Sequence, residues 1–142
     1  MKFLLDTDHI SILQKQSGPE FGTLVSRIAQ VPRADLAFSI ISFHEQVLGC
    51  NVYIAQARTP ADVVRGYQLL DRVLSAFAAA VVLAFDAKAA AACDDLVAKR
   101  VRIATMDLRI ASIALSQGLT LLTRNRRDFS KVPGLVIEDW TI

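Results

Sequence analysis

The chain has 142 residues, of which 53% are hydrophobic, which suits about one globular domain with a buried core. This composition excludes a disordered chain, because enough apolar surface is present to offset the entropy of folding. The formal net charge of +2 is too small to indicate a nucleic-acid partner by itself. We therefore expect a single domain that spans residues 1–142.

No segment predicts membrane insertion or export. The longest apolar run, AFAAAVVLAF at residues 76–85, is well short of the roughly 20 residues that a transmembrane helix needs. The N-terminal sequence MKFLLDTDHIS has acidic residues where a signal peptide would stay apolar. We expect a cytoplasmic protein without a membrane partner. Cys50 and Cys93 lack the spacing of a zinc or redox motif, so they are expected to pack as small hydrophobes.

Short apolar runs alternate with helical patterns from the N-terminus onward. The first half predicts, in order, a strand at residues 2–5, helices at 8–15 and 20–30, a strand at 36–41 and a helix at about 42–57. Pro32 ends the second helix. Ser42 and Glu45 fit the S-x-x-E capping box, in which Ser42 caps the third helix and Glu45 closes the box.

The second half continues the alternation. It predicts a helix from Pro60, a strand at 81–85, a helix at 87–99, a helix from Asp107 to Gly118, a strand at 119–122 and an edge strand at 135–137. Thr59 and Asp86 are the expected helix caps. Helical spacing predicts one buried face for the helix after Thr59, made of Val63, Val64, Tyr67, Leu70, Leu74 and Phe77. The whole pattern predicts an α/β fold with a central, mainly parallel sheet of four to five strands.

Acidic or amide side chains stand where several of these strands give way to a helix or turn. They are Asp6, Glu45, Asp107, Asn125 and Asp128. Ligand sites in open parallel sheets gather beyond the carboxyl ends of the strands, and carboxylates that meet there repel one another unless a cation lies among them. Mg²⁺ or Mn²⁺ prefers such oxygen ligands and also binds phosphates. The first hypothesis is therefore a metal-dependent enzyme that acts on a phosphodiester.

Each acidic residue also has a structural alternative. Asp6 or Asp8 would cap a helix, Glu45 would close its capping box, Asp107 would suit a first helical turn, and Asn125 and Asp128 would stabilise a turn.

Basic residues form two clusters beside the acidic positions. The first comprises Lys99, Arg100 and Arg102, and the second comprises Arg124, Arg126 and Arg127. Such clusters either hold a polyanion next to a metal site or are simply a solvated helix end and a charged turn.

The order and spacing of four segments resemble the PIN-domain family, and more closely its VapC-type toxins. The segments are FLLDTD, SFHEQVLG, MDLRIASIALSQGLTLLTRN and RRDFSKVPGLVIEDW, so the resemblance runs from end to end. It implies a three-layer α/β/α fold and a divalent-metal ribonuclease that is the toxin of a type II toxin–antitoxin pair. It also implies an RNA substrate, a homodimer and a small antitoxin whose C-terminal segment covers the active-site groove.

The resemblance carries site roles onto particular residues. The metal-binding and catalytic positions fall on Asp6, Glu45 and Asp107, with Mg²⁺ or Mn²⁺ as the cofactor. A fourth acidic position of many PIN domains falls on Asn125, whose amide brings no charge, and Asp128 is the alternative. Thr123 and Ser42 are expected to support the site, Thr123 by a hydrogen bond to Asp6.

The expected reaction is hydrolysis by a metal-activated water, which attacks phosphorus in line with the leaving oxygen. Arg124, Arg126 and Arg127 are expected to hold the RNA backbone. His9 and His44 match no catalytic position, and a surface or packing role is expected for both. Core packing is likewise expected for Tyr53, Tyr67 and Phe77, although a dimer or antitoxin surface is the alternative.

Three other functions are consistent with parts of the sequence. A phosphatase of the haloacid dehalogenase type would use Asp6 as nucleophile and Asp8 as acid, but its later lysine and acidic motif are missing. A receiver-like signalling module would bind Mg²⁺ and accept phosphate on Asp86, but it lacks the partner lysine. An inactive PIN domain that only binds RNA is suggested by Asn125, whereas the acids at the other positions argue against it.

Overall fold

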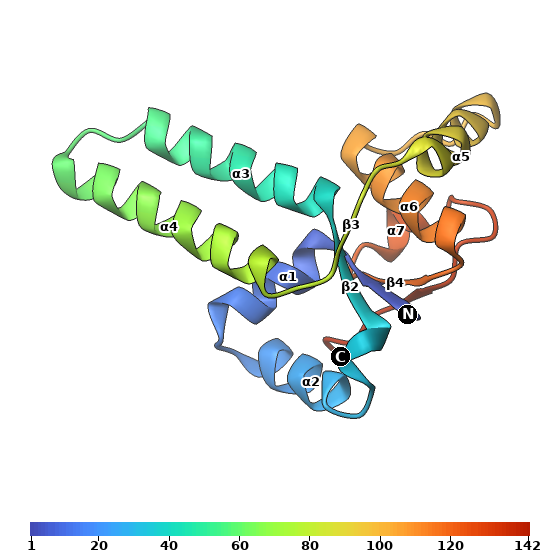
Figure 1. Cartoon of the computed structure of the whole chain (residues 1–142), viewed down its shortest axis with the longest axis horizontal. Helices are drawn as coiled ribbons and strands as arrows, with labels where there is room; N and C mark the ends of the chain where they lie inside the picture. The colour runs from blue at the N-terminus through green and yellow to red at the C-terminus, as the bar shows by residue number, and fades with distance from the viewer.

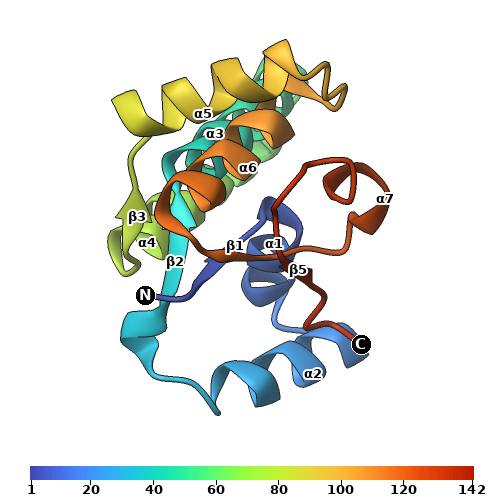
Figure 2. The same cartoon turned by 90° about the vertical axis from the view of Figure 1, so that its right-hand side faces the viewer.

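The computed structural model describes all residues, Met1–Ile142, and contains a five-stranded sheet of order β3-β2-β1-β4-β5 (Figures 1 and 2). The strands are β1 (Phe3–Leu5), β2 (Leu36–Ser39), β3 (Val82–Leu83), β4 (Thr120–Leu122) and β5 (Ile137–Glu138). Every pairing is parallel. The central position of β1 places the residue that follows it, Asp6, in the middle of the carboxyl edge of the sheet. The predicted parallel sheet and its fifth strand at an edge are confirmed.

Helices connect and cover the strands. They are α1 (Thr7–Lys15), α2 (Pro19–Ile28), α3 (Ile40–Ala55), α4 (Pro60–Ala78), α5 (Ala87–Ala98), α6 (Thr105–Gln117) and the short α7 (Arg126–Phe129), with a 3₁₀ turn at Arg33–Asp35. In Figure 1, α3 and α4 form a long hairpin that projects to one side of the sheet, whereas α5, α6 and α7 lie at the other side. None of the helices combines the length and apolar character that a bilayer span requires.

Alternating strand residues divide the core between the two faces of the sheet. Leu4 and Leu121 pack with the buried residues of α5 and α6. Leu5 and Leu122 face the other way and pack with residues of α1, α2 and α4. Because neighbouring residues of a strand point to opposite faces, each central strand contributes to both clusters. This arrangement confirms the expected three layers, with helices on both faces of the sheet.

Two helix starts agree with the sequence, but the start of α3 does not. The side chains of Thr59 and Asp86 accept hydrogen bonds from the backbone N–H groups of Asp62 and Ala89 and cap α4 and α5, as predicted. The cap of α3 is Ser39, whose hydroxyl accepts a hydrogen bond from the N–H of Ser42 at 3.2 Å.

The predicted capping box of Ser42 and Glu45 is therefore wrong. Strand β2 ends earlier than expected, because Ser39 is the last residue that pairs with β3. Ser42 lies buried inside the first turn of α3, and Glu45 lies one turn further along. Both side chains are thereby free to make contacts outside their own helix.

The predicted buried face of α4 is also largely wrong. Phe77 is buried, but Val63, Val64, Tyr67 and Leu74 are 39%, 57%, 55% and 61% exposed. Only the C-terminal part of α4 reaches the core below the sheet, where Phe77 packs edge-on against Phe38 and Phe43. The outer part of the helix packs instead on α3 through Gly66, where an added Cβ would lie 2.6 Å from a side-chain carbon of Ile54.

Candidate active site at the carboxyl edge of the sheet

Asp6 lies at the centre of the candidate site and is held by hydrogen bonds to both of its carboxylate oxygens. Oδ1 accepts from the backbone N–H of Thr7 at 2.8 Å, and Oδ2 accepts from the hydroxyl of Thr123 at 2.7 Å. Thr123 follows β4, the neighbour of β1, so the sheet itself brings the two residues together. The hydrogen bond that was predicted from Thr123 to Asp6 is confirmed. The Asp6 side chain cannot rotate freely, because it is buried and its two oxygens face different donors.

Glu45 reaches the site from α3 and is oriented by α1. The hydroxyl of Thr7 lies 2.9 Å from Glu45 Oε1 and 2.8 Å from the hydroxyl of Ser42. Further along the same contact, the side-chain amides of Gln14 and Gln46 form a reciprocal pair with two hydrogen bonds of 2.8 Å. These polar contacts fix the register of α1 against α3 and therefore the position of Glu45.

Asp107 enters the site from the first turn of α6, and its electrostatics show that the acids converge. Burial, together with the charges of Glu45, Asp128 and Asp8, raises the pKa of Asp107 to about 6. Burial also raises the pKa of Asp6 to about 7, with added repulsion from Asp8 and Asp107, although hydrogen bonds from Thr123 and Thr7 oppose the rise. Acidic residues at the start of α1 and in α3, α6 and α7 thus influence one another at a single location.

The fourth position involves Asn125 and Asp128 together. Asn125 caps α7, because its Oδ1 accepts from the N–H of Asp128 at 3.4 Å, while its Nδ2 donates to Asp128 Oδ2 at 3.1 Å. The predicted turn role is therefore confirmed for Asn125. Asp128 is the residue of the pair that brings negative charge to Asp107.

No basic side chain neutralises these acids. Neither lysine nor arginine forms a salt bridge with Asp6, Glu45 or Asp107. No three acidic, histidine or cysteine side chains are already spaced as a complete metal site. The set of side chains nevertheless fits a hard divalent cation, since it consists of carboxylates whose pKa values are raised by burial and by mutual repulsion. The geometry brings anionic side chains together without the spacing of a complete metal site.

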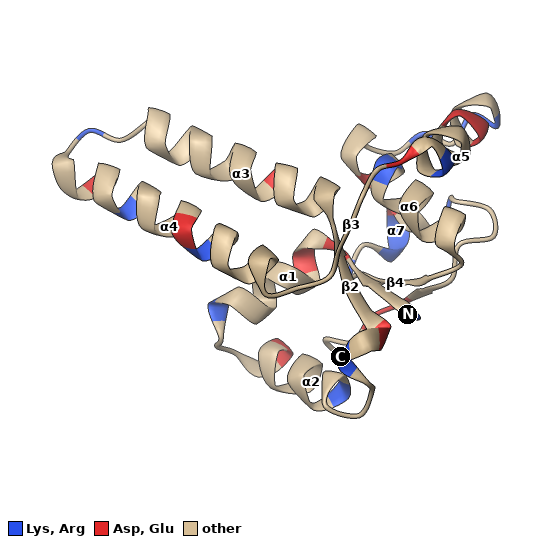
Figure 3. Cartoon of the chain, in the orientation of Figure 1, with Lys and Arg blue, Asp and Glu red and all other residues tan.

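The three arginines near the site point into solvent. Arg124, Arg126 and Arg127 are exposed, and α7 is a predominantly basic segment in Figure 3. The backbone N–H of Arg124 donates to Asp8 Oδ2 at 2.9 Å, so the turn that carries this side chain is itself attached to the acidic cluster. Lys99 of the other basic cluster pairs with Asp95 at 2.8 Å on α5.

Three residues orient or anchor parts of the site, and the sequence did not predict these contacts. Thr7 orients Glu45, Asp8 anchors the turn at Arg124, and His9 contacts Asp8 with its Nδ1 at 2.7 Å from Asp8 Oδ1. All three follow Asp6 directly in the sequence. Each of them also contacts a residue 35 to 131 positions away, and no local pattern predicts these distant contacts. His44 is exposed, as expected.

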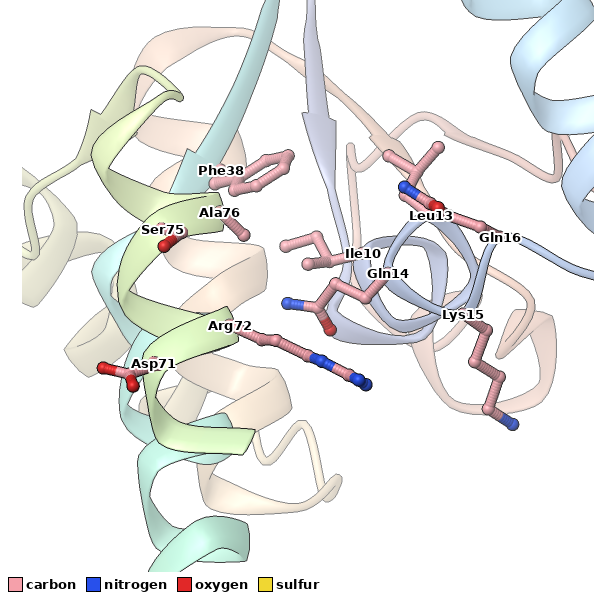
Figure 4. Close-up of a pocket in the computed structure, with 10 residues that line it drawn as sticks. All are labelled: Ile10, Leu13, Gln14, Lys15, Gln16, Phe38, Asp71, Arg72, Ser75 and Ala76. Carbon is pink, nitrogen blue, oxygen red and sulfur yellow. The ribbon is translucent and has the colours of Figure 1, made fainter. Parts of the chain in front are cut away.

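A separate cavity of about 620 Å³ lies between α1 and α4 (Figure 4). Arg72 extends from α4 toward α1 beneath Gln14, whereas Asp71 points away. None of the acidic residues of the candidate site lines this cavity. The cluster of carboxylates therefore lies at the sheet edge and is separate from this cavity.

The fold and the acidic edge together correspond to one protein family. A family model described as "PIN domain" matches residues 3–135, and the chain belongs to this family. The chain is 30% identical to the tRNA(fMet)-specific endonuclease VapC of Salmonella typhimurium over 99% of its own length and 98% of that protein.

Solved structures agree with this assignment. The toxin-like fold superposes on a chain of DNA-bound VapBC from Salmonella typhimurium with a TM-score of 0.76, 26% identity and coverage of 99% and 98% of the two chains. A chain of VapBC2 from Rickettsia felis, bound to a DNA fragment from its promoter, gives a TM-score of 0.71, 24% identity and 99% coverage of both chains. The resemblance inferred from the sequence is confirmed at the level of family and fold.

Proposed function

We propose that the chain is a divalent-metal-dependent endoribonuclease of the VapC type, which acts as the toxin of a type II toxin–antitoxin pair. The observation that supports this proposal best is the convergence of Asp6, Glu45 and Asp107 from three distant segments without a basic partner. The acids suggest where the reaction takes place, and the end-to-end similarity to the Salmonella endonuclease VapC suggests that the reaction is cleavage of RNA.

Mg²⁺ or Mn²⁺ would be held by Asp6 and Asp107, with Glu45 completing the set and Asp128 as the fourth carboxylate in place of Asn125. When bound, the metal supplies a water of lowered pKa and stabilises charge on the phosphate. Asp6 is fixed for this role by Thr7 and Thr123, and Glu45 by Thr7, so the protein does not have to order either side chain on binding. Protein carboxylates then orient the attacking water or accept its proton.

The exposed arginines supply a place for the RNA backbone. We expect Arg124, Arg126 and Arg127 to contact phosphates, because they surround the turn that is attached to Asp8. Replacing Arg126 and Arg127 by alanine should raise KM for RNA and flatten its salt dependence, with a smaller change in kcat.

A cognate antitoxin and self-association complete the proposal. Since the Salmonella and Rickettsia structures are VapBC structures, we expect a small antitoxin that covers the acidic edge and places a basic side chain among the carboxylates. Such a side chain would replace the charge of the metal. A homodimer is also expected.

Two of the alternative functions have little support in the geometry. Asp8 accepts hydrogen bonds on both oxygens, from the backbone N–H of Arg124 and from His9, which does not suit it to be the proton-donating acid of a phosphatase. Asp86 accepts a hydrogen bond from Ala89 at 2.9 Å as the cap of α5, which gives it a structural role in place of phosphate acceptance.

The test is cleavage of defined RNAs by the purified protein, with Mg²⁺ or Mn²⁺ and with EDTA. A panel should include single-stranded RNAs and tRNAs, initiator tRNA among them. We expect metal-dependent internal cleavage of at least one RNA and none with Asp6→Asn. Cleavage that persists in EDTA, or in the Asp6→Asn protein, would contradict the proposal.

A further inference from the structure

His9 is a fully buried polar residue that the proposed reaction does not use. It is 0% exposed, and a buried polar group without a hydrogen bond would be costly. Both ring nitrogens have partners, which come from opposite ends of the chain. Nδ1 lies 2.7 Å from Asp8 Oδ1, and Nε2 accepts from the backbone N–H of Trp140 at 3.2 Å.

These partners determine which nitrogen carries the proton. Because the N–H of Trp140 donates to Nε2, Nε2 is the acceptor and Nδ1–H donates to Asp8. The carboxylate of Asp139 lies 3.8 Å from Nε2, which is too long for a hydrogen bond, and it accepts instead from Thr141. His9 is thus a directed link from the C-terminal segment to Asp8.

Asp8 passes this link to the metal-binding edge. Its Oδ2 accepts from the N–H of Arg124 at 2.9 Å and lies 3.3 Å from the hydroxyl of Thr123. That hydroxyl is also the donor that holds Asp6 Oδ2 at 2.7 Å. A continuous chain of contacts therefore runs from Trp140 through His9 and Asp8 to the turn that orients Asp6.

We propose that His9 is a positioning residue of the metal centre, which orients Asp8 so that Asp8 holds the Thr123–Arg124 turn against Asp6. The inference rests on the proposed metal site. Both oxygens of Asp8 are engaged by donors of the protein, so the Asp8 side chain is held in one position beside the site. An outer hydrogen bond of this kind typically changes metal affinity or activity by about 10- to 100-fold.

Two substitutions of His9 separate its two contacts. In His9→Asn, the side-chain amide nitrogen can replace Nδ1 as the donor to Asp8, while the N–H of Trp140 loses its acceptor. In His9→Gln, the amide oxygen can replace Nε2 for Trp140, while Asp8 loses its donor. Both variants lose one buried hydrogen bond and are expected to have a lower Tm. Trp140→Phe is the matched control, since it removes the 2.6 Å bond from the indole to Glu138 but keeps the backbone N–H on His9.

The experiment measures Mn²⁺ binding to the RNA-free proteins by titration calorimetry, together with hydrogen exchange of the Arg124 amide. We expect His9→Gln to weaken Mn²⁺ binding by about tenfold and to accelerate exchange at Arg124, whereas His9→Asn and Trp140→Phe keep both near wild type. Equal weakening in all three variants would reduce the role of His9 to stability and overturn the inference. Unchanged Mn²⁺ affinity in His9→Gln would also overturn it.

The two readouts distinguish failure of this inference from failure of the proposed function. If wild-type protein binds no Mn²⁺, the metal site itself is disproved, and the positioning role is disproved with it. If wild type binds Mn²⁺ and Arg124 exchange does not respond to His9→Gln, only the positioning role fails.

Discussion

Two regions of the molecule place side chains against their usual preference for water. The acidic edge of the sheet buries polar side chains, whereas an outer stripe of α4, formed by Val64, Tyr67 and Leu74, exposes apolar ones. At the edge, carboxylates lie in partly or fully buried positions, and burial together with their mutual repulsion raises the pKa values of Asp6 and Asp107. On the stripe, large apolar side chains are more than half exposed. The first region is held by a dense set of hydrogen bonds, whereas the second has no partner within the chain.

We expect the two regions to take part in different interactions. Buried carboxylates with fixed donors suit a small cation, as in the proposed reaction. An exposed apolar stripe on a projecting hairpin suits contact with another protein surface. Substitutions in the two regions should therefore separate activity from stability and association.

The largest effect is expected from removing one charge at the acidic edge. Asp6→Asn and Asp107→Asn should reduce RNA cleavage by more than about 100-fold, beyond the effect of losing an outer hydrogen bond. Both proteins should fold, because the amide keeps the shape of the carboxylate. Cleavage assays with circular dichroism as a check on folding test this. Asp94→Asn, an exposed acid of α5, is the control and should remain active.

Substitution at the buried end of α4 should lower the stability of the protein far more than substitution on its exposed stripe. Phe77→Ala should lower the free energy of unfolding by about 3–5 kcal/mol, since it empties a site that is packed against Phe38 and Phe43. Urea denaturation gives the value. A cost below about 1 kcal/mol would mean that the hairpin contributes little to the core.

The acidic edge should also make the metal-free protein sensitive to pH. The folded pKa values of about 7 for Asp6 and about 6 for Asp107 lie above the ordinary value of 3.8, so the folded state binds more protons than the unfolded state between these limits. Stability from these groups is therefore present at low pH and lost as pH rises from about 4 to about 7. We expect the Tm of the wild-type protein in EDTA to fall more over this range than the Tm of Asp6→Asn, which lacks one of the two titrating carboxylates.

Added Mg²⁺ or Mn²⁺ should reverse that loss at neutral pH, because the cation binds the ionised carboxylates of the folded state. A Tm that does not respond to either metal at pH 7.5 would contradict both the site and its electrostatics.

The smallest effect on stability is expected on the stripe. Tyr67→Ser and Leu74→Ser should each change the free energy of unfolding by about 0.5 kcal/mol or less, because both side chains are already exposed. If the stripe takes part in the expected homodimer, sedimentation should show a shift toward monomer. An unchanged sedimentation coefficient in the double variant would place self-association elsewhere.

The sequence predicted the order of strands and helices, because apolar runs and strong caps are local signals. Thr59 and Asp86 cap their helices as their residue types indicated. The start of α3 was misplaced because Ser39 and Ser42 are both plausible caps. Pairing between β2 and β3 decided between them, and pairing is a contact between distant segments.

Other features could not be predicted from local patterns, because they also depend on contacts between distant parts of the chain. The helical period of α4 identifies an apolar stripe but not what covers it, so Tyr67 and Leu74 were placed in the core. The acids Asp6, Glu45 and Asp107 were found because each stands at the end of an apolar run, although their roles as ligands remain predictions. For His9 only a surface or packing role was expected, and its hydrogen bond with Trp140 could not be predicted because the two residues are 131 positions apart.

That separation between His9 and Trp140 has a consequence for the order of events during protein synthesis. The first strand and its aspartate are made well before Thr123, which holds Asp6, and Trp140, which holds His9. The acidic edge therefore cannot be completed until these later residues have been made. If the protein cleaves RNA as proposed, the activity appears only after this delay, which gives an antitoxin time to accumulate nearby.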